Sequence, residues 1–268
     1  MPILTLTSDI GQQDYLVGAV KGQILKTIPD ASLIDISHSL PPFNYPVASY
    51  ICRNAIRNFP AYTFHLLLIN LFSRKPKRLV LAFHEEQYIL CADNGLLGML
   101  LDAKPELVIG IPLSDTEVKN TIYLARVMAE TIQRIQAGTS ILEIGEPDIT
   151  IEEKHPLRPT LGESWMEGQI LLIDHFENIV VNITREQFEQ QRKGRRFTIQ
   201  FRHNEKISSI SETYADVQEG EKLALFNAAG YLEISINKGN AAGLLGLQGF
   251  SEQSQNRLLY QTVQIEFY

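Results

Sequence analysis

The chain has 268 residues, which is enough for one large domain or two smaller ones. Its composition, 44% hydrophobic and 21% charged, is ordinary for a globular protein, and a formal net charge of −7 argues against nucleic acid or anionic membrane lipid as a partner. Its two cysteines match neither a disulfide framework nor a metal site, so we expect reduced thiols and a cytoplasmic protein. No apolar run approaches the ~20 residues that cross a bilayer, and the first residues do not resemble a signal peptide.

The first 150 residues alternate short apolar runs with amphipathic stretches, a pattern that is typical of an α/β domain. Strands are expected over five ranges: 3–8, 33–38, 63–70, 79–84 and 87–91. The third of these is the most apolar, so we expect it in the middle of the sheet. Helices are expected over four ranges: 15–25, 46–58, 96–101 and 123–136.

Prolines and polar residues are frequent in residues 151–164, which we interpret as a linker between two domains. Beyond the linker, short strands with frequent turns predict a small β-barrel or sandwich over 165–268. These strands are expected over six ranges: 168–174, 179–183, 196–202, 222–226, 231–236 and 261–267. The predicted fold is therefore an α/β domain over 1–150, with a mixed sheet flanked by helices, followed by an all-β domain.

The first predicted strand ends at Ser8-Asp9, and Gly11 then interrupts the apolar run. In open α/β sheets, ligands bind at the carboxyl ends of the strands. A carboxylate at this position can accept two hydrogen bonds from a ribose diol, which makes Asp9 a candidate ligand-binding residue. The alternative is that Asp9 caps the helix that follows.

The opening stretch Ser8-Asp9-Ile10-Gly11, together with Asp14-Tyr15 and Lys21-Gly22, resembles the start of the S-adenosyl-L-methionine (SAM) hydroxide adenosyltransferase family. That family is related to the fluorinases and chlorinases. Four further stretches resemble family motifs and follow in the same order: 35–38, 93–97, 174–183 and 230–242.

The resemblance implies a homotrimer whose active site lies between the first domain of one subunit and the second domain of its neighbour. It implies SAM as substrate or ligand, with no further cofactor. Asp9 would hold the ribose, Phe176 and Asn178 would hold the adenine, and Asn94 would line the site. An aromatic face stacks on a purine, and an amide offers both a donor and an acceptor to its edge. The alternatives are core packing for Phe176 and a turn role for Asn178.

The residues that activate water in the family hydrolases are altered in this chain. Asn70 stands where the family has an Asp after the central strand, and 71–76 replaces the glycine-rich loop. The family Arg position falls on Lys77, with Arg78 next to it, and the family His position falls near Lys119. An amide is not basic at neutral pH, so Asn70 cannot be a general base, and the alternative for Asn70 is a helix-cap or turn role. We expect the three cations to act electrostatically on an anion, or to be solvated surface residues.

One more departure concerns the methionine end of the ligand. The family usually has Asn-Ser before the C-terminal signature, whereas this chain has Asn227 and Ala228, so a hydroxyl that helps hold the ligand carboxylate is missing. Halide-using relatives also lack the triad, but no large insertion of the fluorinase kind is present, so we do not favour halide as the nucleophile.

Two functions follow from these observations. The first is a SAM-binding protein resembling the adenosine-forming SAM hydrolases, in which water or hydroxide attacks C5′ to give adenosine and methionine. The second is a catalytically inactive homologue that still binds an adenosyl compound or nucleoside. No histidine pair with metal spacing, Walker loop or nucleophile elbow is present to favour another class of enzyme.

Overall fold

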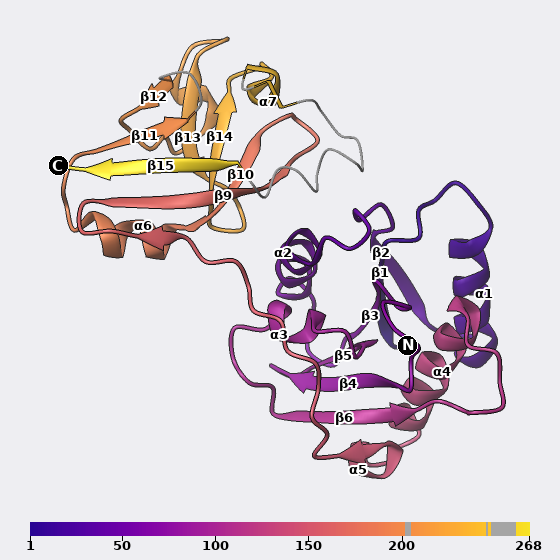
Figure 1. Ribbon diagram of the computed structural model, residues 1–268. Helices are drawn as coiled ribbons and strands as arrows, with labels where there is room; N and C mark the ends of the chain where they lie inside the picture. Colours follow the sequence, from indigo (N-terminus) through magenta and orange to yellow (C-terminus); the bar gives the residue numbers. More distant parts are fainter. Residues whose placement is uncertain (202–204, 245, 248–260) are drawn as a thin grey trace. The chain divides into compact units, whose positions relative to one another are not determined.

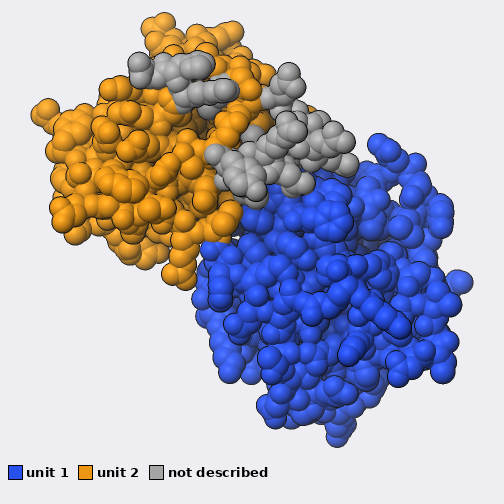
Figure 2. Space-filling view, in the orientation of Figure 1, with its two compact units in different colours: residues 1–156 blue, residues 157–268 orange. Residues whose placement is uncertain are grey.

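The computed structural model describes residues 1–201, 205–244, 246–247 and 261–268 (Figure 1). The chain divides into two compact units, residues 1–156 (unit 1) and residues 157–268 (unit 2), shown in two colours in Figure 2. The boundary falls within 151–164, the range that the sequence predicts as a linker.

Unit 1 is built on a mixed sheet in the order β2-β1-β3-β5-β4-β6-β7. The first four strands in this order run parallel and the remaining pairs are antiparallel. The strands are β1 (Ile3–Ser8), β2 (Ser32–Ser37), β3 (Phe64–Leu68), β4 (Arg78–His84), β5 (Gln87–Ala92), β6 (Leu107–Pro112) and β7 (Glu146–Pro147). The helices are α1 (Leu16–Thr27), α2 (Tyr45–Ile56), α3 (Leu96–Leu100), α4 (Thr121–Gln136) and α5 (Ile141–Ile144).

Helices cover both faces of this sheet (Figure 1). On one face Leu66 packs in the core that α1 and α4 share, and on the other Leu67 packs in the core of α2 and α3. Successive residues of a strand point to opposite faces, so every residue of the central strand β3 is buried. The sequence pattern missed β6, whose six residues include Gly110 and Pro112.

Unit 2 is an antiparallel sheet in the order β12-β11-β15-β9-β10-β14-β13, with β8 added beside β9. Its strands are β8 (Thr160–Leu161), β9 (Trp165–Ile173), β10 (Ile179–Thr184), β11 (Phe197–Phe201), β12 (Glu205–Ile207), β13 (Lys222–Phe226), β14 (Tyr231–Ile236) and β15 (Thr262–Phe267). The helical segments are α6 (Arg185–Arg192), a 3-10 turn at Tyr214–Asp216 and α7 (Ala241–Leu244).

The two outer strands of this sheet, β12 and β13, also touch each other, and Lys222 forms an ion pair with Glu205 between them. The sheet is therefore nearly closed into a barrel, and the predicted fold class is confirmed for both units. The sequence pattern missed α6 because Phe188 is the one buried residue of its eight, although a capping box of Thr184 and Gln187 marks its start. Among the described residues, no helix is long and apolar enough to cross a membrane.

A buried histidine joins three strands of unit 1. Thr5 Oγ1 lies 2.7 Å from His65 Nδ1, and Gln87 Oε1 lies 2.6 Å from His65 Nε2. Because Gln87 Nε2 donates to the Phe59 carbonyl, its oxygen faces the imidazole, so His65 Nε2 carries the proton. Burial lowers the pKa of His65 to about 4.

This histidine makes the stability of unit 1 sensitive to acid. The folded state keeps His65 neutral, while the unfolded chain binds a proton below the ordinary pKa of about 6.5, so stability is lost as the pH falls from about 6.5 towards 4. We expect the free energy of unfolding, from urea denaturation, to fall by about 2 kcal/mol more in the wild type than in His65→Gln between about pH 7.5 and pH 5. The exposed His175→Gln variant is the control, and an equal fall in all three proteins would contradict the assignment.

Candidate functional site

The candidate site of unit 1 lies where β1 and β3 end side by side. The chain leaves β1 to form β2 on one side and returns to form β3 on the other, so these carboxyl ends mark the point where the strand order reverses. Asp9 directly follows β1, and Asn70 follows β3 closely. The Asn70 main-chain N–H donates to Asp9 Oδ2 at 2.9 Å, which joins the two strand ends.

Asp9 is a half-buried carboxylate, and its contacts exclude one of the two roles considered for it, that of a helix cap. Burial raises the pKa of Asp9, and main-chain N–H groups of Asn70 and Asp9 itself partly oppose this shift. The residue before α1 is Tyr15, and Asp14 Oδ1, not Asp9, accepts the Leu16 N–H at the start of that helix. Asp9 therefore does not cap α1. A carboxylate has about four acceptor positions, so it can accept further hydrogen bonds from a ligand.

Asn70 is a left-handed turn residue, with φ at 47°. Its Oδ1 accepts the Phe43 N–H at 3.0 Å, so its Nδ2 must be the other amide atom, and that buried nitrogen has no hydrogen-bond partner within the described ranges. The turn role proposed for Asn70 as an alternative is present in the structure. The side chain holds a loop in place through its oxygen, and its remaining amide group is a donor, not a base.

Asn94, two residues after the end of β5, supports this turn. Its Nδ2 donates to the carbonyls of Ile69 and Asn70 at 2.9 and 3.2 Å, and its Oδ1 accepts the Leu96 N–H at the start of α3. The Asn94 side chain is buried, so it braces the strand end instead of presenting a free amide.

Phe43 is a residue that the sequence reasoning missed. It is 72% exposed, it lies in the left-handed region with φ at 62°, and its N–H is the one bound by Asn70. An exposed aromatic ring suits a ligand with a flat ring. The signal in the sequence was a large aromatic residue directly after Pro41-Pro42, at the end of the loop that follows β2.

The four candidate catalytic residues do not form one group. Lys77 and Arg78 line a cavity of about 290 Å³ together with Asn94, whereas Lys119 lines a neighbouring cavity of about 370 Å³. Asn70 does not line either cavity.

Arg78 differs from the two lysines in its partners. Its Nε and Nη2 donate to Asp93 Oδ2 at 3.0 and 2.8 Å, and Nη2 also donates to the Thr150 carbonyl at 2.5 Å. The side chains of Lys77 and Lys119 have no such partner among the residues described. Arg78 is therefore tied to the protein, while both lysines keep their charge available.

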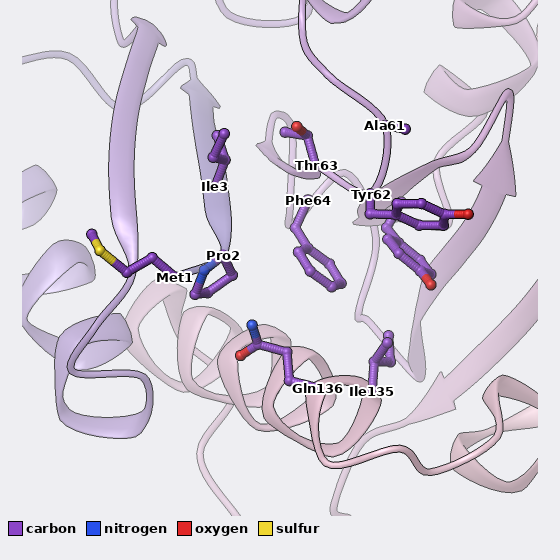
Figure 3. A pocket seen from close by; sticks show the side chains of 10 residues that line it. Met1, Pro2, Ile3, Ala61, Tyr62, Thr63, Phe64, Ile135 and Gln136 are labelled. Carbon is purple, nitrogen blue, oxygen red and sulfur yellow. The ribbon is translucent and has the colours of Figure 1, made fainter.

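A further cavity of about 390 Å³ opens at the amino ends of β1 and β3, opposite the ends that carry Asp9 and Asn70 (Figure 3). Figure 3 shows Pro2 and Ile3 on one side, Tyr62 and Phe64 on the other, and Gln136 of α4 below. Its lining contains no acidic or basic side chain. This hollow lies away from Asp9 and does not belong to the candidate site.

In unit 2, Phe176 and Asn178 lie in the turn between β9 and β10. Asp174 closes this turn, because its carboxylate accepts the main-chain N–H groups of Phe176 and Asn178 and the Asn178 Nδ2. Phe176 is 72% exposed, so it is not a core residue, whereas Asn178 is buried and takes part in the turn. The exposed ring is free to stack on a ligand.

Asn227 and Ala228 lie elsewhere in unit 2. Asn227 Oδ1 accepts the N–H groups of Ala229 and Tyr231 in the turn between β13 and β14. Thr184 pairs with Tyr231 while Ile179 pairs with Ile234, so this turn and the Phe176 turn adjoin opposite ends of the β10–β14 pair. The structure thus does not bring Asn227 and Ala228 beside Phe176.

The segment beside Phe176 is instead the start of α7. The Ala242 N–H donates to the Glu177 carbonyl at 3.0 Å, so the stretch 239–242 packs against this turn. The sequence reasoning used that stretch as a motif without naming a site residue in it. In the described parts of the chain, no three His, Cys, Asp or Glu side chains come together in a group that could hold a metal ion.

Comparison with known families decides what kind of protein carries these features. The model of the SAM hydroxide adenosyltransferase N-terminal domain matches residues 4–145, and that of the C-terminal domain matches residues 168–252. The chain belongs to the SAM hydroxide adenosyltransferase family. The resemblance inferred from the sequence motifs is therefore confirmed.

Curated members of the SAM hydroxide adenosyltransferase family and their relatives match over most of their length. A (R)-S-adenosyl-L-methionine hydrolase of Methanocaldococcus jannaschii is 26% identical, with 94% of this chain and 95% of the relative covered. The hydrolase of the same name from Thermus thermophilus is also 26% identical, over 90% of this chain and 94% of the relative. A fluorinase of an Actinoplanes species is 24% identical, with 88% of this chain and 91% of the relative covered.

The fold is shared with solved structures. The crystal structure of an uncharacterized conserved protein from Thermotoga maritima superposes with a TM-score of 0.80 at 22% identity and covers 98% of both chains. A conserved hypothetical protein from Thermus thermophilus gives a TM-score of 0.70 at 23% identity, covering 100% of this chain and 99% of that one.

The buried amide of Asn94 can be tested by its effect on stability. Asn94→Ala would remove the side-chain partner of the buried Ile69 carbonyl and of the Leu96 N–H, while the Asn70 carbonyl keeps the Ser73 N–H, and this loss costs about 1–3 kcal/mol of unfolding free energy. Asn58→Ala is the control, since its Nδ2 makes one exposed bond to the Asn54 carbonyl and its loss should cost less than about 0.5 kcal/mol. Equal losses in the two variants, measured by urea denaturation, would contradict the bracing role of Asn94.

Proposed function

We propose that this member of the family binds SAM by its adenosyl part and hydrolyses it slowly to adenosine and methionine. The observation that carries the proposal is the Asp9 carboxylate, held by the Asn70 N–H at the point where the strand order reverses. A half-buried carboxylate with spare acceptor positions suits the two hydroxyls of a ribose. The names of the hydrolase relatives support SAM as the compound.

The exposed ring of Phe176 supports the adenine end of this proposal. Asn178 would contribute through the turn that it helps to hold, because its Nδ2 already donates to Asp174. As in the family resemblance, we propose that Asp9 of one copy and Phe176 of another meet in a homotrimer. Asn227 and Ala228 would have at most an indirect part, since the Asn227 side chain closes its own turn.

The chemistry needs little from the protein at the leaving group. Attack on C5′ of SAM expels methionine from a sulfonium, so the protein mainly has to align a nucleophile and exclude water around it. Asn70 cannot remove a proton from that nucleophile. Lys77 and Lys119 are the candidates for attracting hydroxide to the site, because both keep an uncompensated charge, whereas Arg78 is held by Asp93.

A second function, binding without turnover, is favoured by one observation. The Asn70 oxygen is occupied by the Phe43 N–H, so the side chain at the position of the family carboxylate serves the fold of the loop. A protein of this kind would hold an adenosyl compound without activating water. Incubation with SAM followed by chromatography for adenosine separates the two functions.

The ribose assignment is tested at Asp9. Loss of a charged acceptor from a ligand contact costs about 1.5–3 kcal/mol, so Asp9→Asn should raise the dissociation constant for SAM roughly ten- to a hundredfold. Isothermal titration calorimetry measures the change. The exposed Asp30→Asn is the matched control, and an unchanged constant in Asp9→Asn would remove this residue from the site.

The catalytic assignment is tested by restoring the family residues. General acid–base assistance contributes about 10²–10⁴ in rate, so the wild type should form adenosine far more slowly than a relative with the triad. The triple variant Asn70→Asp, Lys77→Arg and Lys119→His should form adenosine at least about tenfold faster than the wild type. Rapid turnover by the wild type, unaffected by Asn70→Asp alone, would place the chemistry on other residues.

A further inference from the structure

A second buried histidine contacts the segment that carries Asp9. His38 directly follows β2 and is 2% exposed. Its Nδ1 lies 2.7 Å from the Oγ of Ser8, the fully buried last residue of β1, and its carbonyl accepts the Gly11 N–H at 2.7 Å. His38 therefore holds the chain on both sides of Asp9, through its side chain at residue 8 and through its backbone at residue 11.

The outer nitrogen of this imidazole faces a carboxylate. His38 Nε2 lies 3.1 Å from Asp35 Oδ1, in a close contact that is not aligned as a hydrogen bond. Asp35 Oδ2 in turn accepts a hydrogen bond from Lys21 Nζ at 2.5 Å. Because a carboxylate only accepts, it favours the proton on Nε2, which leaves Nδ1 to accept from the Ser8 hydroxyl. The orientation of the ring is thus set from both sides.

Ser8, His38 and Asp35 have the composition of a hydrolytic triad, but their arrangement is a different one. In such a triad the serine contacts Nε2 and the carboxylate contacts Nδ1, and here the two are exchanged. Ser8 is also fully buried, so its hydroxyl cannot reach an external substrate. These contacts join three of the sequence stretches that resemble family motifs, those with Ser8, with Lys21 and with residues 35–38. Their effect has to pass through a neighbour of Ser8.

That neighbour is Asp9, which has little freedom to move. Its Oδ2 accepts the Asn70 N–H at 2.9 Å from the adjacent strand end. Gly11 has φ at 76°, so the chain turns sharply directly after this segment. The Ser8 carbonyl also accepts the Leu40 N–H at 3.4 Å. A carboxylate that receives both hydroxyls of a diol has to keep its orientation, and these contacts fix the backbone on which that orientation depends.

We propose that His38 is a positioning residue for ribose binding, which acts through its bond to Ser8 on the neighbouring Asp9. The proposal rests on the proposed function, in which Asp9 binds the ribose diol. Without the imidazole bond, the end of β1 is free to shift, and the carboxylate then meets the two hydroxyls less well. The loss should fall on the diol and not on the adenine, because Phe176 belongs to unit 2.

The test uses two ligands that differ in the diol. Adenosine has both ribose hydroxyls and 2′,3′-dideoxyadenosine has neither, so the ratio of their dissociation constants isolates the diol. The wild type should prefer adenosine roughly ten- to a hundredfold in calorimetry. His38→Gln should lower this preference by at least about fivefold, because the polar end of glutamine corresponds to Nε2 and leaves Ser8 without its partner. His38→Asn should keep it, since its amide is attached to Cγ as Nδ1 is.

A second variant and a matched control complete the comparison. Ser8→Ala removes the other end of the same bond, so it should lower the preference as His38→Gln does, and the double variant should lower it no further. His65→Gln is the control, because His65 Nδ1 makes a bond of the same 2.7 Å length to Thr5, within β1 and away from its end. This variant should lose stability and keep the preference for adenosine.

Amide hydrogen exchange without ligand separates this proposal from the proposed function. The Asn70 N–H should exchange at least about fivefold faster in His38→Gln and Ser8→Ala than in the wild type and His38→Asn, because its acceptor Asp9 is held less well. If the wild type does not prefer adenosine, the ribose assignment fails, and exchange alone decides whether His38 positions Asp9.

Three results would overturn the positioning role. One is an unchanged preference for adenosine in both His38→Gln and Ser8→Ala, or, where the wild type has no preference, unchanged exchange of the Asn70 N–H in both. Another is a loss in His38→Asn as large as that in His38→Gln, which would show that the Ser8 bond is not what matters. The third is the same loss in His65→Gln, which would show a general effect of stability.

Discussion

The structure of the candidate site depends on one hydrogen bond, from the Asn70 main-chain N–H to the Asp9 carboxylate. It joins the ends of two neighbouring parallel strands, where the chain changes direction across the sheet and no further strand residue can fill the crevice. Burial raises the pKa of Asp9, so the carboxylate there needs hydrogen-bond donors from the main chain and from a ligand. The crevice is therefore suited to a compound with hydroxyl groups.

The strand end and the loop next to the Asp9 carboxylate are held by the side-chain amides of asparagines, not by charged groups. Asn94 braces the end of β3, and Asn70 holds the loop at Phe43 through its oxygen. Both side chains are buried, and each amide oxygen accepts a main-chain N–H, so neither can serve as an acid or a base. Such a crevice can order a ligand well while giving little help to proton transfer, which agrees with a slow hydrolase or a binder.

Charge in this part of unit 1 is unevenly distributed. Asp93 and Glu152 engage Arg78, Arg74 and Lys154. Glu152, expected in the linker, belongs to unit 1, where its N–H donates to Asp93, and the Thr150 carbonyl just before the predicted linker accepts a hydrogen bond from Arg78. Two lysines of the same loop are left over.

The sequence by itself determined the fold class, because apolar periodicity and turn residues are local properties. The family was indicated by the resemblance of its motifs to those of a known family, whose listed members are 24–26% identical to this chain. It also placed Asp9 at a strand end. Only the tertiary structure decided that Asp9 does not cap α1, that Arg78 is held by Asp93, and that Asn227 adjoins the opposite end of the β10–β14 pair from Phe176. These facts depend on strand register and on contacts between residues far apart in the chain, which no local pattern encodes. Phe43 was missed for the same reason, since only the folded loop brings it to Asn70.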